Sequence, residues 1–251
     1  MQTFEPGAYR PAADLLTDRI ILVTGAGAGI GRAAAKAFAL HGATVLLLGR
    51  TVRKLESVYD EIIAADAPEP AIAVLDLAKA QGPDYFGLAD KIQQDYGRLD
   101  GLLHNAGILG DRSPIEQYDV GTWAQVMHIN LTASFVLTQV LLPLLKASPD
   151  ASIVFASSGV GRQGRAHWGA YAVSKFGVEG LSQVLADETS RTGNLRVNCI
   201  NPGRTRTAMR LQAYPGEDPD TLPAPDAVLG AYLYLMGPDS RGVTGQSLDA
   251  Q

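Results

Sequence analysis

Tyr171 and Lys175 stand four residues apart in the segment Tyr-Ala-Val-Ser-Lys. At that spacing two side chains lie next to each other on one face of a helix. Ser158 precedes the tyrosine by 13 residues and ends a predicted strand, so the three side chains are expected at one strand-end crevice, where α/β proteins bind ligands. Their hydroxyl, phenol and ammonium groups could carry out hydrogen bonding and proton transfer. The tyrosine–lysine pair alone is a weak signal, because chance supplies one in about one chain in five of this composition.

A glycine-rich turn follows the first predicted strand, in the sequence Thr24-Gly-Ala-Gly-Ala-Gly-Ile-Gly31. A tight turn needs positive φ, and any side chain would keep a pyrophosphate away from the N–H groups that begin the next helix. Three glycines at set positions arise by chance about 0.3 times in such a chain. The position of the turn between a strand and a helix therefore supports dinucleotide binding more strongly than the glycine spacing does. A purely structural turn is the alternative.

The end of the second predicted strand favours NADP(H) over NAD(H). An NAD site places an acidic residue there to bind the ribose hydroxyls, but the stretch from Gly25 to Lys54 contains no Asp or Glu. The strand ends instead at Arg50, whose guanidinium can bind a 2′-phosphate, with an ordinary solvated arginine as the alternative. Asp76, after the third strand, is placed to meet the adenine edge or to cap the following helix.

Helical and strand patterns alternate along the chain. Their apolar strands are continuous rather than alternating, which indicates a parallel sheet covered on both faces, the doubly wound architecture. Residues 202–226 contain five prolines and are interpreted as a lid or insertion beside a site. Strands are predicted at 20–24, 44–48, 71–75, 99–104, 152–156 and 195–200, and helices at 30–40, 52–65, 85–96, 118–146 and 171–191.

Composition excludes several classes of protein. The chain has 251 residues, 46% of them hydrophobic and 19% charged, which fits one large α/β domain or at most two small ones. A net charge of −5 gives no general attraction to nucleic acid or anionic lipid, so neither partner is expected. Cys199 is the only cysteine and forms no internal disulfide. No metal is expected, because metal-ligand spacing is absent among the histidines, which are His41, His104, His128 and His167.

The compartment predicted from targeting patterns is the cytoplasm. Residues 1–18 carry neither a signal peptide nor an Arg-rich transit pattern. The longest apolar stretch, Leu131 to Leu145, is interrupted by polar residues and is shorter than the ~20 residues that a membrane span needs. A buried or interface helix is therefore expected there, and no membrane partner.

Several motifs together resemble those of the single-domain short-chain dehydrogenase/reductases, over about residues 19–248. They are the glycine turn, His104-Asn-Ala-Gly107, Ser158, Tyr171-x-x-x-Lys175 and Pro202-Gly203. Within that family, segments 102–110, 161–171 and 196–209 look like the YciK-like bacterial oxidoreductases. The resemblance implies one Rossmann-like α/β domain over 1–251, with a seven-stranded parallel sheet, helices on both faces and a substrate lid at about 204–226. It also implies a homodimer or homotetramer.

The resemblance implies NADPH-dependent reduction of a small-molecule carbonyl compound, or the reverse alcohol oxidation. Tyr171 becomes the general acid/base, Lys175 holds the nicotinamide ribose, and Ser158 aligns the carbonyl. Lowering the tyrosine pKa from near 10 to ~7 takes ~4 kcal/mol, which Lys175 and the oxidised nicotinamide could supply. Asn130 matches a family residue that holds a water behind Lys175, and a tolerated structural polar residue is the alternative.

Cofactor contacts implied by the motifs run along the whole chain. Among them, Asn105 is expected to stabilise the strand as well, and Thr205 and Thr207 match the segment that contacts the nicotinamide carboxamide. The expected contacts are Thr24, Gly25, Gly27, Gly29, Ile30, Gly31, Arg50, Asp76, Leu77, Asn105, Ala106, Gly107, Tyr171, Lys175, Pro202, Gly203, Thr205 and Thr207.

Two positions depart from the family pattern. Ala28 stands where many NADP-preferring relatives carry a basic residue, and segment 245–251 replaces the usual Asp-Gly-Gly. His167 and Trp168 are candidates for lining the substrate pocket, with plain packing as the alternative. A catalytically silent NADP(H)-binding regulatory protein on the same fold is the alternative function, although Ser158, Tyr171 and Lys175 are all retained.

Five arginines surround the predicted site. If they converge on its mouth, the substrate carries a carboxylate or phosphate, and surface salt bridges or subunit contacts are the alternative. These residues are Arg162, Arg165, Arg204, Arg206 and Arg210.

Overall fold

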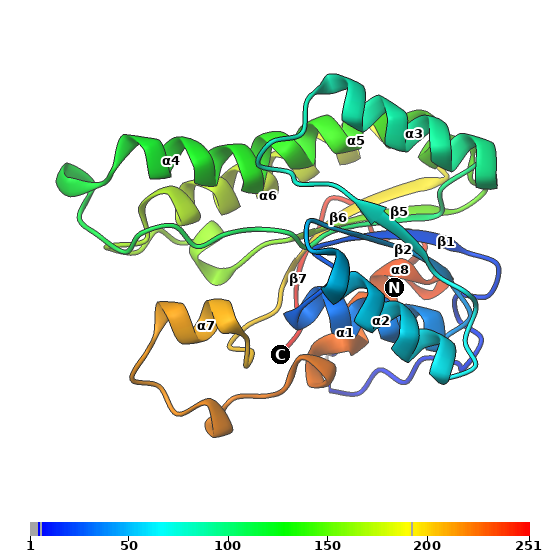
Figure 1. Cartoon of the computed structure of the whole chain (residues 1–251), viewed down its shortest axis with the longest axis horizontal. Helices are drawn as coiled ribbons and strands as arrows, with labels where there is room; N and C mark the ends of the chain where they lie inside the picture. The colour runs from blue at the N-terminus through cyan, green and yellow to red at the C-terminus, as the bar shows by residue number, and fades with distance from the viewer. Residues whose placement is uncertain (1–4, 6, 192) are drawn as a thin grey trace.

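Seven parallel strands form one sheet in the computed structural model, in the order β3-β2-β1-β4-β5-β6-β7 (Figure 1). The strands are β1 Ile20–Thr24, β2 Thr44–Gly49, β3 Ala71–Val74, β4 Gly101–His104, β5 Ala151–Ala156, β6 Leu195–Asn201 and β7 Ser247–Asp249. The structure describes residues 5, 7–191 and 193–251, so part of segment 1–18 and of the domain predicted over 1–251 lies outside the described residues. The predicted doubly wound class and its seven strands are confirmed.

The strand order reverses between β1 and β4. The chain builds β2 and β3 on one side of β1 and then returns to its other side for β4. In open α/β sheets the ligand crevice lies at such a switch point, outside the carboxyl ends of the strands. The glycine turn follows β1 and Ser158 follows β5, so both lie at this edge of the sheet.

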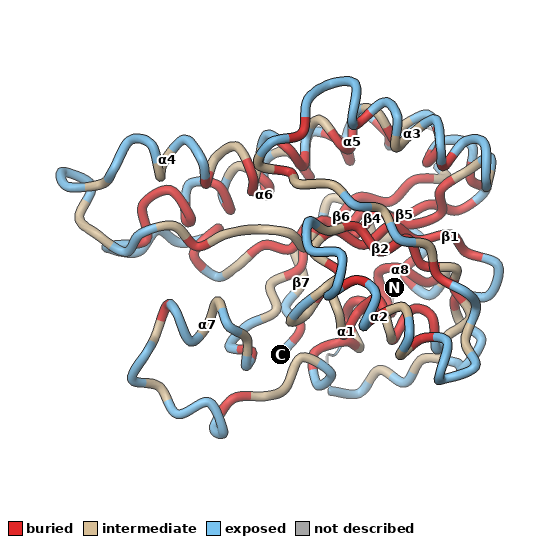
Figure 2. The backbone as a smooth tube through the Cα atoms, in the orientation of Figure 1, coloured by how far each residue is buried: buried red, intermediate tan, exposed pale blue. Residues whose placement is uncertain are grey.

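Helices cover both faces of the sheet, with their outer sides exposed and the strands buried between them (Figures 1 and 2). On one face the small side chains of an alanine-rich helix let it approach the strands closely. That layer consists of α1 Gly29–Leu40, α2 Val52–Ala64 and α8 Leu229–Met236. The opposite layer consists of α3 Gly82–Tyr96, α5 Ala133–Ala147 and α6 Gly169–Thr189.

The helix predicted over 118–146 has three parts. Asp119 caps α4 (Val120–Met127) by accepting a hydrogen bond from the Thr122 N–H at 2.6 Å. A π-helical turn, His128–Thr132, then leads into α5. Such turns are frequent at functional sites, and this one contains Asn130.

The apolar stretch Leu131 to Leu145 is predicted to be too short to span a membrane, and this prediction is wrong for the helical segment that contains it. The continuous helical stretch Val120–Ala147 is long and apolar enough to cross a membrane by length and composition. Half of its most apolar window is buried inside the fold, where Leu137, Leu141 and Leu145 belong to the core between the sheet and α3. Packing against the core therefore explains why this helical segment is rich in apolar residues.

Segment 202–226, predicted as a lid, contains one short helix, α7 (Ala208–Ala213), followed by 3₁₀ turns. Thr207 caps α7 by accepting a hydrogen bond from the Arg210 N–H at 3.1 Å. Cys199 lies in the middle of β6 and is 1% exposed, and burial raises its pKa to about 12. It is a buried, protonated thiol.

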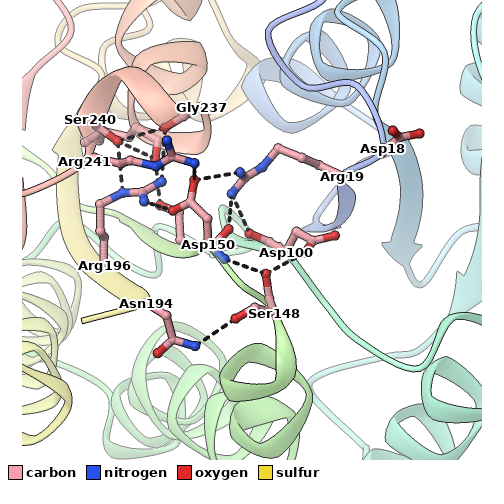
Figure 3. Close-up of polar contacts among 12 residues, drawn as sticks. Asp18, Arg19, Asp100, Ser148, Asp150, Asn194, Arg196, Gly237, Ser240 and Arg241 are labelled. Atoms are coloured by element: carbon pink, nitrogen blue, oxygen red, sulfur yellow. Dashed lines mark hydrogen bonds and ion pairs between the residues drawn. The ribbon is translucent and has the colours of Figure 1, made fainter. Parts of the chain in front are cut away.

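A buried ionic cluster joins the amino-terminal ends of the central strands (Figure 3). Asp150 binds Arg19 at 3.1 Å and also binds Arg196, while Arg19 donates to the backbone carbonyls of Asp100 and Asp150. Burial raises the pKa of the Asp150 carboxyl, but the charges of Arg196 and Arg19 outweigh it and leave that pKa below its ordinary value. The cluster lies at the opposite edge of the sheet from the glycine turn and fixes the strands there.

Candidate active site

A cavity of about 380 Å³ runs along the carboxyl edge of the sheet, from the end of β2 to Tyr171. Most of the predicted cofactor contacts line it, and Thr24, Gly31, Gly203 and Thr205 do not. The lining contacts are Gly25, Gly27, Gly29, Ile30, Arg50, Asp76, Leu77, Asn105, Ala106, Gly107, Tyr171, Lys175, Pro202 and Thr207. Sequence reasoning missed further lining residues, among them Thr51, Lys54, Ile108, Ser157 and Met209.

The glycine turn leaves the start of α1 open to the cavity. Gly25 and Gly29 have φ values of +67° and +54°, which favour glycine. Ala28 precedes α1 and gives no side-chain cap, and the first turn carries no acidic residue. The first N–H groups of the helix are therefore available to an anionic group such as a pyrophosphate.

Thr24 and Asn105 hold the two strands at the switch point. The Thr24 Oγ1 accepts hydrogen bonds from the N–H groups of Asn105 and Ala106, both at 3.0 Å, and donates to the Leu103 carbonyl at 3.2 Å. Gly31 packs against the Asn105 amide, where a Cβ atom would collide with it. Thr24 and Gly31 therefore shape the cavity from behind rather than lining it.

The far end of the cavity has the composition of a phosphate site. Arg50, Thr51 and Lys54 line it, just after β2. Asp76 is the one carboxylate among the described lining residues, and its Oδ1 accepts a hydrogen bond from the Ala78 N–H at 3.1 Å. Asp76 thus faces the cavity and caps the turn after β3, and the alternative that it caps the following helix is wrong, because Gln81 is the N-cap of α3.

Tyr171 and Lys175 line the other end of the cavity together with Ser157, and the predicted Ser158 is not among the lining residues. The Ser158 side chain lies near the Tyr171 phenol and acts to lower its pKa. Lys175 Nζ lies 5.5 Å from the Tyr171 ring centroid and donates to the Ala156 carbonyl at 2.6 Å. Tyr171 and Lys175 project from one face of α6, as their spacing predicts.

The pKa of Tyr171 differs in direction from the expectation. Burial raises it to about 12, and the Ser158 side chain opposes this only in part. Burial also lowers the pKa of Lys175 to about 8, although the charge of the Glu179 carboxylate acts to raise it. Near pH 7 the residues therefore stand as a neutral phenol beside an ammonium group. The predicted lowering would need the further positive charge of an oxidised nicotinamide.

Asn130 fixes the wall of the cavity. Its side-chain amide donates to the Ile108 carbonyl at 2.9 Å and to the Ser174 hydroxyl at 3.0 Å, and its Oδ1 accepts from the Ile108 N–H at 2.8 Å. The side chain thus clamps the loop after β4. This geometry favours a positioning role through Ile108.

Segment 247–251 braces the loop that follows β6. Asp249 binds Arg162 and the Asn201 amide, each at 2.8 Å, and the Asn201 Oδ1 accepts from the Gly203 N–H at 3.1 Å. The Gln251 amide donates to the Pro202 carbonyl at 2.5 Å and to the Thr205 hydroxyl at 3.2 Å. Gly203 and Thr205 thus support the loop, while Pro202 and Thr207 face the cavity.

The five arginines do not converge on the cavity. Arg204 and Arg210 both bind Glu217, Arg206 binds Asp220, and Arg162 binds Asp249. Arg165 donates to the Tyr214 hydroxyl at 3.0 Å. The arrangement matches the alternative of surface salt bridges.

The histidines give no sign of a metal site. His104 is buried, its Nε2 lies 2.8 Å from the Thr138 hydroxyl, and its ring stacks on Phe155. Burial lowers its pKa to about 3, so it is a neutral core residue. Within the described ranges no three metal-ligating side chains come together.

Comparison with known proteins agrees with this geometry. Residues 19–218 match the sequence profile of the short chain dehydrogenases. The oxidoreductase YciK of Escherichia coli strain K12 is 54% identical over 243 residues, which make up 97% of this chain and 96% of YciK. A short chain dehydrogenase from Pseudomonas syringae superimposes with a TM-score of 0.96 at 56% identity, covering 97% of this chain and 98% of its own. One from Shigella flexneri 2a, complexed with NADP, gives a TM-score of 0.93 at 55% identity and covers 96% and 100%.

Proposed function

The chain belongs to the short-chain dehydrogenase family, and from this premise we propose that it is an NADP(H)-dependent oxidoreductase that reduces carbonyl compounds. The observation that carries the proposal is the placement of Tyr171 and Lys175 side by side at one end of a cavity whose other end is lined by Arg50 and Lys54. The NADP of the Shigella structure supports the choice of cofactor.

The cavity residues fit NADP(H). The uncapped start of α1 suits the pyrophosphate, and Arg50 with Lys54 suits the 2′-phosphate. Bound NADPH would supply the hydride that adds to the carbonyl carbon. The protein's part is to hold the carbonyl in place and to protonate its oxygen.

Tyr171 is the proposed proton donor. With a pKa of about 12 the phenol is protonated near pH 7, and an alkoxide formed by hydride addition is a much stronger base than a phenolate. The phenol proton passes to that oxygen, and the phenolate regains a proton from solvent. The protonated state of Tyr171 thus supports reduction as the direction that begins most readily.

Ser158 and Lys175 prepare this step. In this proposal Ser158 hydrogen-bonds the carbonyl oxygen that Tyr171 protonates. Lys175 spends one of its three N–H groups on the Ala156 carbonyl, which leaves two for the nicotinamide ribose. Its ammonium charge would also stabilise the phenolate that remains after proton transfer.

The test is NADPH oxidation by the purified protein with a panel of aldehydes, ketones, quinones and 3-oxoacyl thioesters. We expect Tyr171→Phe to lower turnover by about 10²- to 10⁴-fold and to leave the Kd for NADPH within about twofold. NADPH binding without turnover of any compound would support the silent regulatory protein instead. Undiminished turnover in Tyr171→Phe would refute the role of the phenol.

We further propose a cytoplasmic homo-oligomer. The outer sides of α5 and α6 carry exposed apolar residues, among them Phe135, Phe176 and Val184, which are 45%, 45% and 57% exposed. An apolar surface of this kind suits association between copies of the chain. Light scattering during size-exclusion chromatography would measure the assembly, and a mass equal to one chain would contradict it.

A further inference from the structure

A groove of about 480 Å³ continues from the cofactor cavity toward α4 and α7, which lie at the same end of the molecule (Figure 1). The groove and the cavity share Gly107, Ile108, Ala208 and Met209. The remaining lining residues are Leu109, Gly110, Asp111, Thr122, Gln125 and Gln212. A substrate whose carbonyl lies at Tyr171 would extend its other groups into this groove.

The first wall of the groove is held in position by side chains behind it. Asn130 clamps Ile108 through both of its backbone polar groups. The Tyr118 hydroxyl accepts a hydrogen bond from the Asp111 N–H at 3.2 Å. Asp111 therefore belongs to a wall that hydrogen bonds within the chain hold in place.

Arg112 fastens this wall to the opposite one. Its guanidinium lies 4.8 Å from the Trp168 ring centroid and 5.0 Å from that of Tyr214, and it donates to the Ala213 carbonyl at the end of α7. Arg112 is thus engaged by two aromatic rings and a backbone carbonyl. These contacts hold the groove together, and Arg112 is not among the residues that line it.

The groove carries no basic side chain among its described lining residues. Thr122, Gln125 and Gln212 supply neutral hydrogen-bonding groups, and Asp111 supplies a carboxylate. The nearby arginines on segment 204–210 are bound by Glu217 and Asp220. A carboxylate or phosphate in the groove would meet the like charge of Asp111 and no basic side chain among the described lining residues.

The outer helices at this end give no docking surface for an acidic carrier protein either. From Ser113 to Leu145 the sequence contains no Lys or Arg. A carrier with negative charges would find no complementary charge along α4 and α5.

We propose that this groove selects an uncharged carbonyl compound that carries a hydrogen-bonding group, such as an ester, amide or hydroxyl. Asp111 excludes carboxylate- and phosphate-bearing counterparts, and the amides of Gln125 and Gln212 bind the neutral group. This inference rests on the proposed function and names the substrate class for the same site.

The experiment compares matched pairs of probes with the NADPH-loaded protein. The pairs are 3-oxo esters and the 3-oxo acids with the same carbon chain, assayed for kcat/KM and, on the NADP⁺-loaded protein, for binding by calorimetry. We expect the ester to be favoured by at least about tenfold in both measurements. Equal or stronger use of the acids would overturn the proposal, and so would the absence of binding by every member of the series.

Three variants assign the effect to the groove. Asp111→Lys should reduce the ester-to-acid ratio by at least about tenfold, and Asp111→Asn should reduce it less. Asp90→Lys makes the same charge change at an exposed position on α3 and should leave the ratio unchanged. An unchanged ratio in Asp111→Lys would overturn the assignment. Failure of the proposed function would look different, because then Tyr171→Phe would reduce the esters as fast as the parent protein.

Discussion

Replacing Asp150 with asparagine should destabilise the protein more than any surface substitution. The carboxylate is shared by Arg19 and Arg196, whose exposed fractions are 9% and 5%, and it also binds the more exposed Arg241 at 3.2 Å. Asparagine keeps the size of the side chain and removes its charge, so two guanidinium groups lose their buried counter-charge. Removing one partner of a buried ion pair typically costs about 3–5 kcal/mol of unfolding free energy. For a chain of this size that corresponds to a fall in Tm of about 6–20 °C.

The pH dependence follows from the lowered pKa of Asp150. A group whose pKa is lower in the folded state stabilises the protein above its unfolded pKa, near 3.9 for Asp. That contribution disappears as the pH falls through the folded pKa. The difference in stability between parent and variant should therefore be constant near neutral pH and shrink in acid.

Thermal and urea denaturation of parent and variant would measure this effect, with Asp90→Asn as the control because Asp90 is exposed on α3. The control should change the unfolding free energy by less than about 0.5 kcal/mol. The Kd for NADPH should not change in Asp150→Asn below its melting temperature, because the cluster and the cavity lie at opposite edges of the sheet. A loss of less than about 1 kcal/mol would refute the idea that Asp150 balances the buried arginines.

Three further predictions concern the cavity. Arg50→Ala should weaken NADPH binding about tenfold or more and leave NADH binding within about twofold, because only NADPH has the 2′-phosphate. Fluorescence titration would measure both affinities, and equal losses for the two cofactors would contradict this prediction. Since the pKa of Lys175 is about 8, kcat/KM should fall about tenfold per pH unit above pH 8 as the ammonium group deprotonates. A pH profile of kcat/KM that stays flat to pH 10 would contradict this role of Lys175. Asp249→Asn should raise the KM for NADPH about two- to fivefold, because it removes the partly exposed ion pair between Asp249 and Arg162. A lower Tm at constant KM would contradict this and indicate a purely structural role.

The sequence predicts the sheet and the centre of the site because their signals are local. Apolar runs mark the strands, and the glycine turn marks the start of α1. The neighbourhood of Tyr171 and Lys175 follows from helical spacing alone. The last strand, β7, has only three residues and no strong apolar pattern, so the family resemblance alone predicts it.

Features that depend on distant partners could not be predicted in this way. Arg162 and Asp249 are separated by 87 positions, and Asp150 and Arg196 by 46. The sequence shows the arginines near the site but not the groups that bind them, so the sequence alone is compatible with an anionic substrate. The raised pKa of Tyr171 has the same origin, because burial depends on the packing of the whole site.

The burial of Cys199 makes this protein a convenient subject for fluorescence labelling. Its thiol is protonated and inaccessible, and the sequence contains no other cysteine. Maleimide dyes react with thiolates, so the folded protein should remain unlabelled. Leu211→Cys, at a 54% exposed position on α7, would then provide a single reactive thiol without removal of the native one. A dye at that position would report on the movement of α7 as cofactor and substrate bind.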